Sequence, residues 1–316
     1  MKEFVIKPNE SNQRFDKYLK KLLPNANTSF IYKMLRKKNI TLNQKKASGN
    51  EIIINGDIVK LFFSDETFDK FSGGDDVFAE EYNGLKKLEL KGIKIIYEDD
   101  DVLIVDKPAN MLSQKAANTD ISANERLLAY LIKSNSLDFT TFKTFRPSVC
   151  NRLDRNTTGL LLMGKSLKGS QKLSEMLKNR SIKKFYRAIV IGEIRKPLTL
   201  EGFLKKDESN NTVTITKEQN EGSSYIKTAY KPIKVNNGLT LLEVHLITGR
   251  THQIRAHLSS IGHPVLGDLK YGDNNSNSLW RKKGVGHQLL HSYRIEFDED
   301  KMVIAPVPEI FEQVME

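Results

Sequence analysis

From residue 92 onward the chain consists mainly of short strand-like runs, and this pattern limits the fold more than any other feature. The strand-like runs occupy residues 93–97, 102–107, 159–166, 183–192 and 240–248. Helical apolar spacing is clear only at 167–180 and 250–262. Strands and helices do not alternate regularly, as they would in a parallel βαβ fold. We therefore expect an α+β domain built on a mostly antiparallel mixed sheet with flanking helices.

The first 63 residues have a different pattern and predict a small separate domain. Apolar residues with helical spacing begin at Phe15 and stop before Pro24, and Ser or Thr at 28–29 can cap a second helix. Short strands at 40–42 and 52–54 and a turn at 55–57 follow, and then a strand at 58–63.

Positive charge is concentrated in this N-terminal part. The chain carries a net charge of +11, and residues 11–60 hold eleven basic and three acidic residues, a local charge of +8. A compact basic domain beside a nearly neutral one is typical of nucleic-acid binding. The alternative is a solvated, lysine-rich helix face. The candidate RNA-binding residues fall mostly off the apolar stripe of the second helix: Lys33, Arg36, Lys37 and Lys38.

Residues 64–88 are rich in Asp and Glu and contain Ser72-Gly73-Gly74, which predicts a flexible acidic linker. The predicted organisation is a domain over 1–63, a linker over 64–88 and a second domain over 89–316.

Several classes of protein are excluded by missing signals. The sequence has no apolar run near the roughly 18 residues of a membrane span, and it does not begin like a signal peptide. The single cysteine, Cys150, cannot form an intrachain disulfide. We expect a cytoplasmic protein. Phosphate-binding glycine motifs, an HExxH motif and a GxSxG motif are all missing, so no nucleotide cofactor, metal or other cofactor is expected.

Two segments, 151–159 and 248–255, are unusually rich in charged and hydrogen-bonding side chains for short connections beside apolar strands. In residues 151–159, Arg152 and Arg155 flank Asp154, which should keep the carboxylate ionised and fit to act as a nucleophile or base. The alternative is a turn in which the carboxylate bonds backbone amides.

The second segment, 248–255, leads through a glycine into a helix N-terminus. It presents Arg250, His252, Gln253 and Arg255, a set of donors suited to phosphate or carboxylate. The alternative is an ordinary capped helix start.

Longer blocks of the chain resemble a known family. "RFDKYLKKLLPNANTSFIYKMLRKKNITLNQ" and the following "NGD" turn resemble the α-L RNA-binding domain. "EDDDVLIVDKPANML", "NRLDRNTTGLLLMGKS", "KKFYRAIVIG" and "LITGRTHQIRAHLSSIGHPVLGDLKYG" resemble the signature blocks of RluA-type RNA pseudouridine synthases. Together the two resemblances cover nearly the whole chain.

The resemblance implies roles for single residues. Asp154 matches the catalytic aspartate, Tyr186 the ring that stacks on the target base, and Arg255 the arginine that pairs with the carboxylate. Arg152 matches the arginine that braces the RNA, and Leu290 matches the apolar wall of the uracil pocket.

The sequence departs from the family pattern in three places. Asn151 stands where His is usual, Thr158 stands where Ser is usual, and residues 110–114 replace a common glycine-containing stretch. The three proposed catalytic residues are retained.

The implied function is isomerisation of uridine to pseudouridine in structured RNA, with 23S ribosomal RNA as the expected substrate and transfer RNA as a second candidate. Asp154 would attack the ribose anomeric carbon or remove the proton from ribose carbon 2, and both routes stay open. Tyr186 would hold the free base and take the proton from carbon 5. A monomer is expected. The rival function is a non-catalytic RNA-binding or ribosome-associated factor, which leaves the blocks at 151–159 and 248–255 unexplained.

Overall fold

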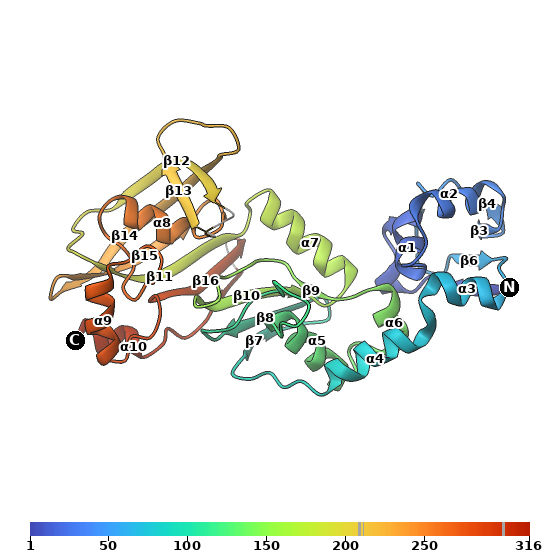
Figure 1. The fold of residues 1–316 in the computed structure, drawn as a ribbon, viewed down its shortest axis with the longest axis horizontal. Helices are drawn as coiled ribbons and strands as arrows, with labels where there is room; N and C mark the ends of the chain where they lie inside the picture. The colour runs from blue at the N-terminus through green and yellow to red at the C-terminus, as the bar shows by residue number, and fades with distance from the viewer. Residues whose placement is uncertain (208–209, 211, 299–300) are drawn as a thin grey trace.

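The computed structural model describes residues 1–207, 210, 212–298 and 301–316. The molecule is elongated, with the N-terminal domain at one end and the large sheet and the C-terminus at the other (Figure 1). None of the helices within these ranges is long and apolar enough to cross a membrane.

The N-terminal domain follows the predicted order of helices and strands. Its elements are β1 (Lys2–Val5), a 3-10 turn (Pro8–Glu10), β2 (Gln13–Arg14), α1 (Phe15–Leu22), α2 (Thr28–Arg36), β3 (Ile40–Leu42), β4 (Lys45–Lys46), β5 (Ile52–Ile53) and β6 (Ile58–Leu61). The strands form a sheet in the order β1-β6-β3-β4 and a separate β2-β5 pair. Phe15, Leu19, Ile31 and Leu35 pack in its core. The cap of α2 is Asn27, whose side chain accepts from the Phe30 amide, and not Ser or Thr at 28–29.

Residues 64–88, predicted to be a flexible linker, instead form two helices, α3 (Asp65–Ser72) and α4 (Gly74–Lys86). The reason is that an aromatic residue of each helix packs against one of the two domains. Phe71 lies 4.1 Å from Phe30 of α2 between ring centroids, so α3 belongs to the N-terminal body. Tyr82 of α4 packs edge-on against Phe142, and its hydroxyl donates to the Leu137 carbonyl at 3.0 Å.

Direct contacts also join the two bodies. Thr144 donates to the Glu10 carboxylate, which is buried in the N-terminal domain. Gln171 Nε2 donates to the Asn12 carbonyl at 2.9 Å. The N-terminal domain is therefore held against the second domain by polar contacts as well as by α4.

The second domain is built on one large sheet. Its strands are β7 (Lys94–Glu98), β8 (Val102–Lys107), β9 (Ser148–Val149), β10 (Thr158–Gly164), β11 (Lys183–Ile191), β12 (Leu198–Asp207), β13 (Thr212–Thr216), β14 (Ser224–Asn236), β15 (Leu239–Leu246), β16 (Leu290–Asp298) and β17 (Lys301–Ile304). The order is β13-β12-β14-β15-β11-β16-β10-β8-β7, with β9 on β10 and β17 on β16. Among the described strands, only β10 and β16 pair in parallel, which confirms the predicted α+β class.

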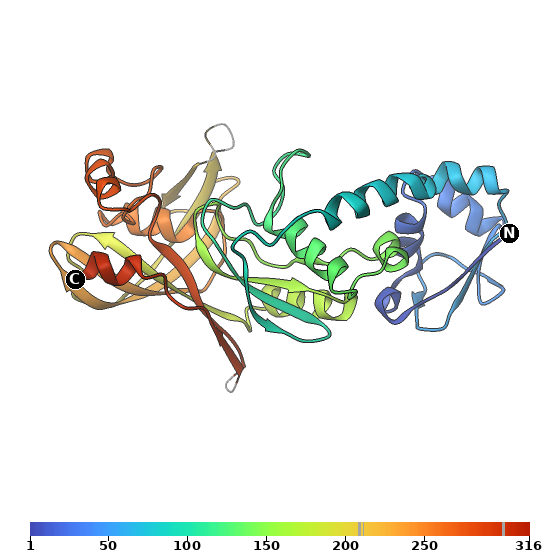
Figure 2. The same ribbon diagram turned by 90° about the horizontal axis from the view of Figure 1, so that it is seen from below.

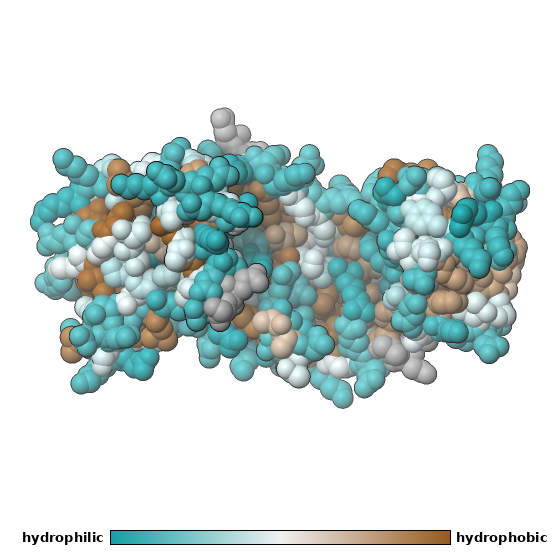
Figure 3. All heavy atoms as spheres, turned by 45° about the horizontal axis from the view of Figure 1, so that its top comes forward, coloured by the Kyte–Doolittle hydropathy of each residue, from teal (hydrophilic) through white to brown (hydrophobic). Residues whose placement is uncertain are grey.

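Helices cover both faces of this sheet (Figure 2). They are α5 (Ala123–Lys133), α6 (Phe139–Thr144), α7 (Leu167–Lys178), α8 (Gln253–Ser260), α9 (Asn274–Lys282) and α10 (Ile310–Met315). Alternate β10 side chains face opposite cores: Leu161 packs with α5 residues, and Leu162 packs with Leu173 of α7. Figure 3 shows that hydrophilic side chains cover most of the visible surface.

The parallel β10–β16 pair brings the segment after Asp154 beside the chain near Leu290. Gly159 has φ +108°, and a Cβ there would lie 2.2 Å from the Ser292 carbonyl oxygen. Only glycine allows this close approach, which explains its place at the end of the 151–159 segment.

Candidate active site

One cleft collects the predicted site residues of the second domain. It has an open volume of about 350 Å³ and lies between the 152–157 loop, β11 and the start of α8. Its lining includes Arg152, Asp154, Tyr186, Arg250, His252, Gln253, Arg255 and Leu290. Residues separated by more than 130 positions in the chain therefore meet at one site.

Asp154 forms the predicted ion pair with Arg255. Arg255 Nη1 donates to Asp154 Oδ2 at 2.8 Å, and the Asp154 side chain is 24% exposed in the cleft. The pairing, inferred from the resemblance alone, is confirmed. The two flanking arginines are both exposed, and within the described residues the cation paired with Asp154 is Arg255. Arg152 and Arg155, which flank the carboxylate in the sequence, are not among its ion-pair partners in the described part of the chain.

A second carboxylate, Asp268, fixes the other side of the Arg255 guanidinium. Asp268 is fully buried and accepts from Arg255 Nε at 2.6 Å and Nη2 at 2.8 Å. The amides of Lys270 and Tyr271 also donate to it. Burial alone would raise the pKa of Asp268, but the bonds and charge of Arg255 outweigh it and hold the pKa below its ordinary value. The bonds to Asp268 thus fix the orientation of the guanidinium that donates to Asp154.

Sequence reasoning missed Asp268, although it lies inside the quoted "GHPVLGDLKYG" block. It also missed two residues that hold the backbone on either side of Asp154. The Ser113 hydroxyl donates to the Leu153 carbonyl at 2.8 Å and accepts from the Leu153 amide at 2.9 Å. Ser113 belongs to the stretch 110–114 that departs from the family pattern, and in this chain it anchors the segment before Asp154.

The other anchor is Lys107, at the end of β8. Its ammonium is fully buried and donates to the carbonyls of Pro108, Met111 and Arg155 at 2.9, 2.8 and 3.2 Å. Burial lowers the pKa of Lys107 to about 7, although the negative charge of Asp154 opposes the shift. No pattern in the sequence marks a lysine as buried, because lysine is normally a surface residue.

The turn before α8 holds the remaining predicted donors. Gln253 is buried, and its amide bonds Thr248, Thr228, the Lys227 carbonyl and the Arg250 amide. These internal contacts occupy both ends of its side chain and stabilise the turn. Arg250, by contrast, is exposed at the cleft.

His252 begins α8 in the left-handed conformation, with φ +54°. Its Nδ1 lies 3.0 Å from the Tyr271 hydroxyl, and its Nε2 lies 4.0 Å from Asp154. Burial lowers the pKa of His252, with the Asp154 charge opposing, so the ring is neutral at neutral pH. A non-glycine residue in this strained conformation is frequent at functional sites.

Tyr186 and Leu290 form the apolar part of the cleft. Tyr186 is 4% exposed, and burial raises its pKa to about 12. Tyr186 lines the cleft, where its ring can stack on a base, and its role as the base that takes the proton from uracil carbon 5 stays a prediction.

The four basic residues of the N-terminal domain lie elsewhere. Lys33, Arg36, Lys37 and Lys38 are exposed at the end of α2, while Ile31, Met34 and Leu35 are buried as predicted. Within the ranges that the structure describes, no group of three or more His, Cys, Asp or Glu residues could hold a metal ion.

Comparison with known proteins identifies the family of this chain. A family model described as RNA pseudouridylate synthase matches residues 101–260. Ribosomal large subunit pseudouridine synthase C of Vibrio vulnificus is 28% identical, with 97% of this chain and 93% of that protein covered. The protein of the same name from Rickettsia bellii is 34% identical, with 83% of each chain covered.

Among solved structures, human RNA pseudouridylate synthase domain containing 4 shares the fold. Its TM-score is 0.57 at 18% identity, with 74% of this chain and 95% of that chain covered. Matches of this extent favour the enzyme over the rival non-catalytic factor. The chain belongs to the RNA pseudouridylate synthase family, enzymes that isomerise uridine to pseudouridine in RNA.

Proposed function

We propose that Asp154 is the catalytic carboxylate of this synthase and that its substrate is large-subunit ribosomal RNA. One observation carries the assignment of Asp154. Its carboxylate lies open to the cleft, yet Arg255 holds one oxygen in a fixed position, and Arg255 is itself fixed by the buried Asp268. Such preorganisation is what a group needs when it must meet one atom of a flexible substrate.

The target uridine must leave the RNA stack to reach this cleft, at a cost of a few kcal/mol. Tyr186 then stacks on the uracil ring, and Leu290 supplies an apolar wall. Arg152 and Arg250, both exposed at the rim, meet the flanking phosphates.

Chemistry begins at the sugar. Asp154 attacks the anomeric carbon as the bond to uracil N1 breaks, or it removes the proton from ribose carbon 2 so that the same bond breaks by elimination. The detached uracil turns within the cleft, and its carbon 5 bonds to the anomeric carbon. On the first route the bond between Asp154 and the anomeric carbon breaks at this step, and on the second route Asp154 returns the proton to ribose carbon 2. Carbon 5 then loses its proton to solvent, and N1, which left with the bonding electron pair, takes one from solvent, so the product is an isomer of the substrate. The bond from Arg255 to Asp154 suits either route, because it holds one carboxylate oxygen in place and leaves the side chain open to the cleft.

The relatives' names support the choice of RNA. Both curated relatives are named as large-subunit enzymes and are matched over most of their length. Because ribosomal RNA is the proposed substrate, we propose that the protein acts in the cytoplasm. We also propose a monomer, because one chain supplies all the residues of the described cleft. Transfer RNA is the second candidate substrate.

Mapping pseudouridines in ribosomal and transfer RNA, from cells with and without the gene, tests the substrate. We expect loss of one or more pseudouridines from large-subunit RNA and restoration by the wild-type gene. Loss only from transfer RNA would refute the ribosomal assignment. An Asp154→Asn gene that restores the modification would refute the catalytic assignment.

We also propose that the basic end of α2 binds RNA phosphates. If Lys33, Arg36, Lys37 and Lys38 each neutralise one phosphate, changing all four to Gln should flatten the log–log salt dependence of RNA affinity by about three units. The residues are exposed, so folding should not change. An unchanged slope would mean that this face is merely solvated.

A further inference from the structure

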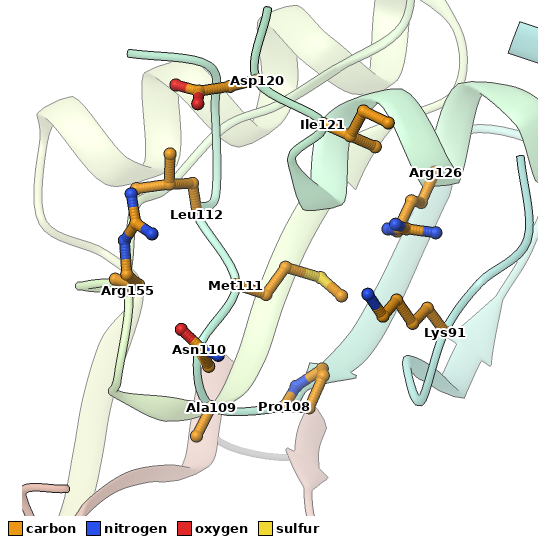
Figure 4. A pocket seen from close by; sticks show the side chains of 10 residues that line it. All are labelled: Lys91, Pro108, Ala109, Asn110, Met111, Leu112, Asp120, Ile121, Arg126 and Arg155. Carbon is orange, nitrogen blue, oxygen red and sulfur yellow. The ribbon is translucent and has the colours of Figure 1, made fainter. Parts of the chain in front are cut away.

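A second cavity, larger than the catalytic cleft, lies on the other side of the loop that carries Asp154. It has an open volume of about 680 Å³ and is lined by the turn before β7, the segment after β8, the start of α5 and Arg155. Figure 4 shows the side chains that surround it. None of the roles proposed above uses this cavity.

The cavity is positively charged. Figure 4 shows Lys91 and Arg126 side by side on one wall and Arg155 on the opposite wall. Its one carboxylate, Asp120, accepts from the amides of Ala116 and Ala117 at 3.0 and 2.8 Å, so its charge is already engaged.

The two adjacent cations have no carboxylate partner among the described residues. Arg126 Nη1 donates to the Glu89 carbonyl at 2.5 Å, but its buried Nε has no partner. The Glu89 carboxylate pairs with Lys133 at 2.7 Å instead. Two like charges placed side by side favour an anion between them.

Apolar groups complete the cavity. Met111 points toward Lys91 in Figure 4, and Pro108 lies beside it. Ile121 is 51% exposed at the rim, so its apolar side chain is accessible to a molecule in the cavity. Cations next to an apolar wall match a nucleotide, which joins a phosphate to a base with an apolar face.

The cavity and the catalytic loop share one backbone segment. The Arg155 carbonyl accepts from the Met111 amide at 3.1 Å and from Lys107. Asp154 thus lines the cleft and Arg155 lines the cavity from consecutive positions, so one RNA strand can reach both.

We propose that this cavity is a second nucleotide subsite, which holds an unpaired nucleotide of the same RNA strand as the target uridine. The backbone phosphate binds between Lys91 and Arg126, and the base lies against Met111 and Ile121. The proposal rests on the RNA-modifying function proposed above. Holding a neighbouring nucleotide would help to keep the strand open while the target uridine is extruded.

The test measures RNA affinity at several salt concentrations with an unpaired, uridine-containing fragment of large-subunit RNA. The variants are Lys91→Gln, Arg126→Gln and the double variant. The matched control is Arg281→Gln/Lys282→Gln, which removes the same two charge types from exposed positions on α9. Lys91 is exposed, so its single variant keeps the test valid if Arg126 variants unfold.

We expect the double variant to bind about tenfold more weakly, roughly the effect of one charge-assisted hydrogen bond. The salt slope should fall by about 0.7, the value for one phosphate on a single strand. The fragment is unpaired, so its target uridine does not have to be extruded from a helix, and the single-turnover rate at saturating enzyme should stay within about twofold. Ile121→Ser should weaken binding without changing the slope, since it removes apolar contact and no charge.

Affinity and slope equal to those of the α9 control would overturn the proposal. The proposal would also be overturned if wild type and the double variant bound RNA equally well while Lys91→Gln lost binding of free uridine monophosphate, because the cavity would then serve a free nucleotide. Failure of the underlying function has a different signature: wild-type protein would bind the RNA but produce no pseudouridine.

Discussion

Replacing Asp268 by Asn should lower the free energy of unfolding more than replacing Asp154 by Asn, although Asp268 is not among the residues that line the cleft. The Asp268 carboxylate is fully buried and accepts from four donors: two guanidinium nitrogens of Arg255 and two backbone amides. An amide has one acceptor oxygen and turns an NH₂ group toward the remaining donors. Removing one partner of a buried ion pair costs about 3–5 kcal/mol.

Asp154→Asn provides the matched control on the same arginine. Asp154 is partly exposed, and Arg255 keeps both bonds to Asp268 when Asp154 is neutralised. We expect a loss of no more than about 1 kcal/mol, typical of a partly solvated pair. Urea unfolding should rank the variants as wild type, Asp154→Asn and then Asp268→Asn, with the last also losing kcat because Arg255 is no longer oriented. An Asp268→Asn protein as stable as Asp154→Asn would refute the anchoring argument.

Three further outcomes follow from single contacts. The pKa of Asp268 is depressed in the folded protein, so its carboxylate stabilises the fold fully above the ordinary pKa of about 4. The difference in unfolding free energy between wild type and Asp268→Asn should therefore be constant from pH 8 to 5 and shrink only as acid protonates Asp268. Gly159→Ala should prevent folding or lower the melting temperature sharply, because the new Cβ would collide with the Ser292 carbonyl. The control Gly222→Ala also has a positive φ, but its Cβ would point into open space, so it should lower the free energy of thermal unfolding by only about 1 kcal/mol. Lys107→Met should cost about 1–3 kcal/mol in urea unfolding and lower kcat more than it raises KM, since three carbonyls beside the catalytic loop lose a donor; an unchanged kcat would contradict the anchoring role.

Local patterns in the sequence predicted the regular elements well. The spacing of Phe15 and Leu19 predicted α1, and the apolar run at 160–163 predicted the buried strand β10. The error at 64–88 arose because acidic composition and a Ser-Gly-Gly sequence are typical of linkers. Helix formation there depends on Phe71 and Tyr82 finding apolar partners that are far away in the chain.

The site was predictable only where longer motifs could be matched to a family. Asp154 and Arg255 are 101 positions apart, and no spacing rule pairs them. Lys107 and Asp268 are buried charges whose partners are set by the tertiary fold, so their roles could be seen only in the structure. The ion-pair partner of Asp154 could not be read from its neighbours for the same reason: Arg152 and Arg155 are exposed, and the distant Arg255 forms the pair.

The most direct test of the central claim is tritium release from large-subunit RNA labelled at uracil carbon 5, because that hydrogen leaves only when the new carbon–carbon bond has formed. Wild-type protein should release tritium, and Asp154→Asn should release none while keeping its fold and its affinity for the same RNA. Undiminished release by a folded Asp154→Asn protein would contradict the assignment of Asp154 as the catalytic carboxylate.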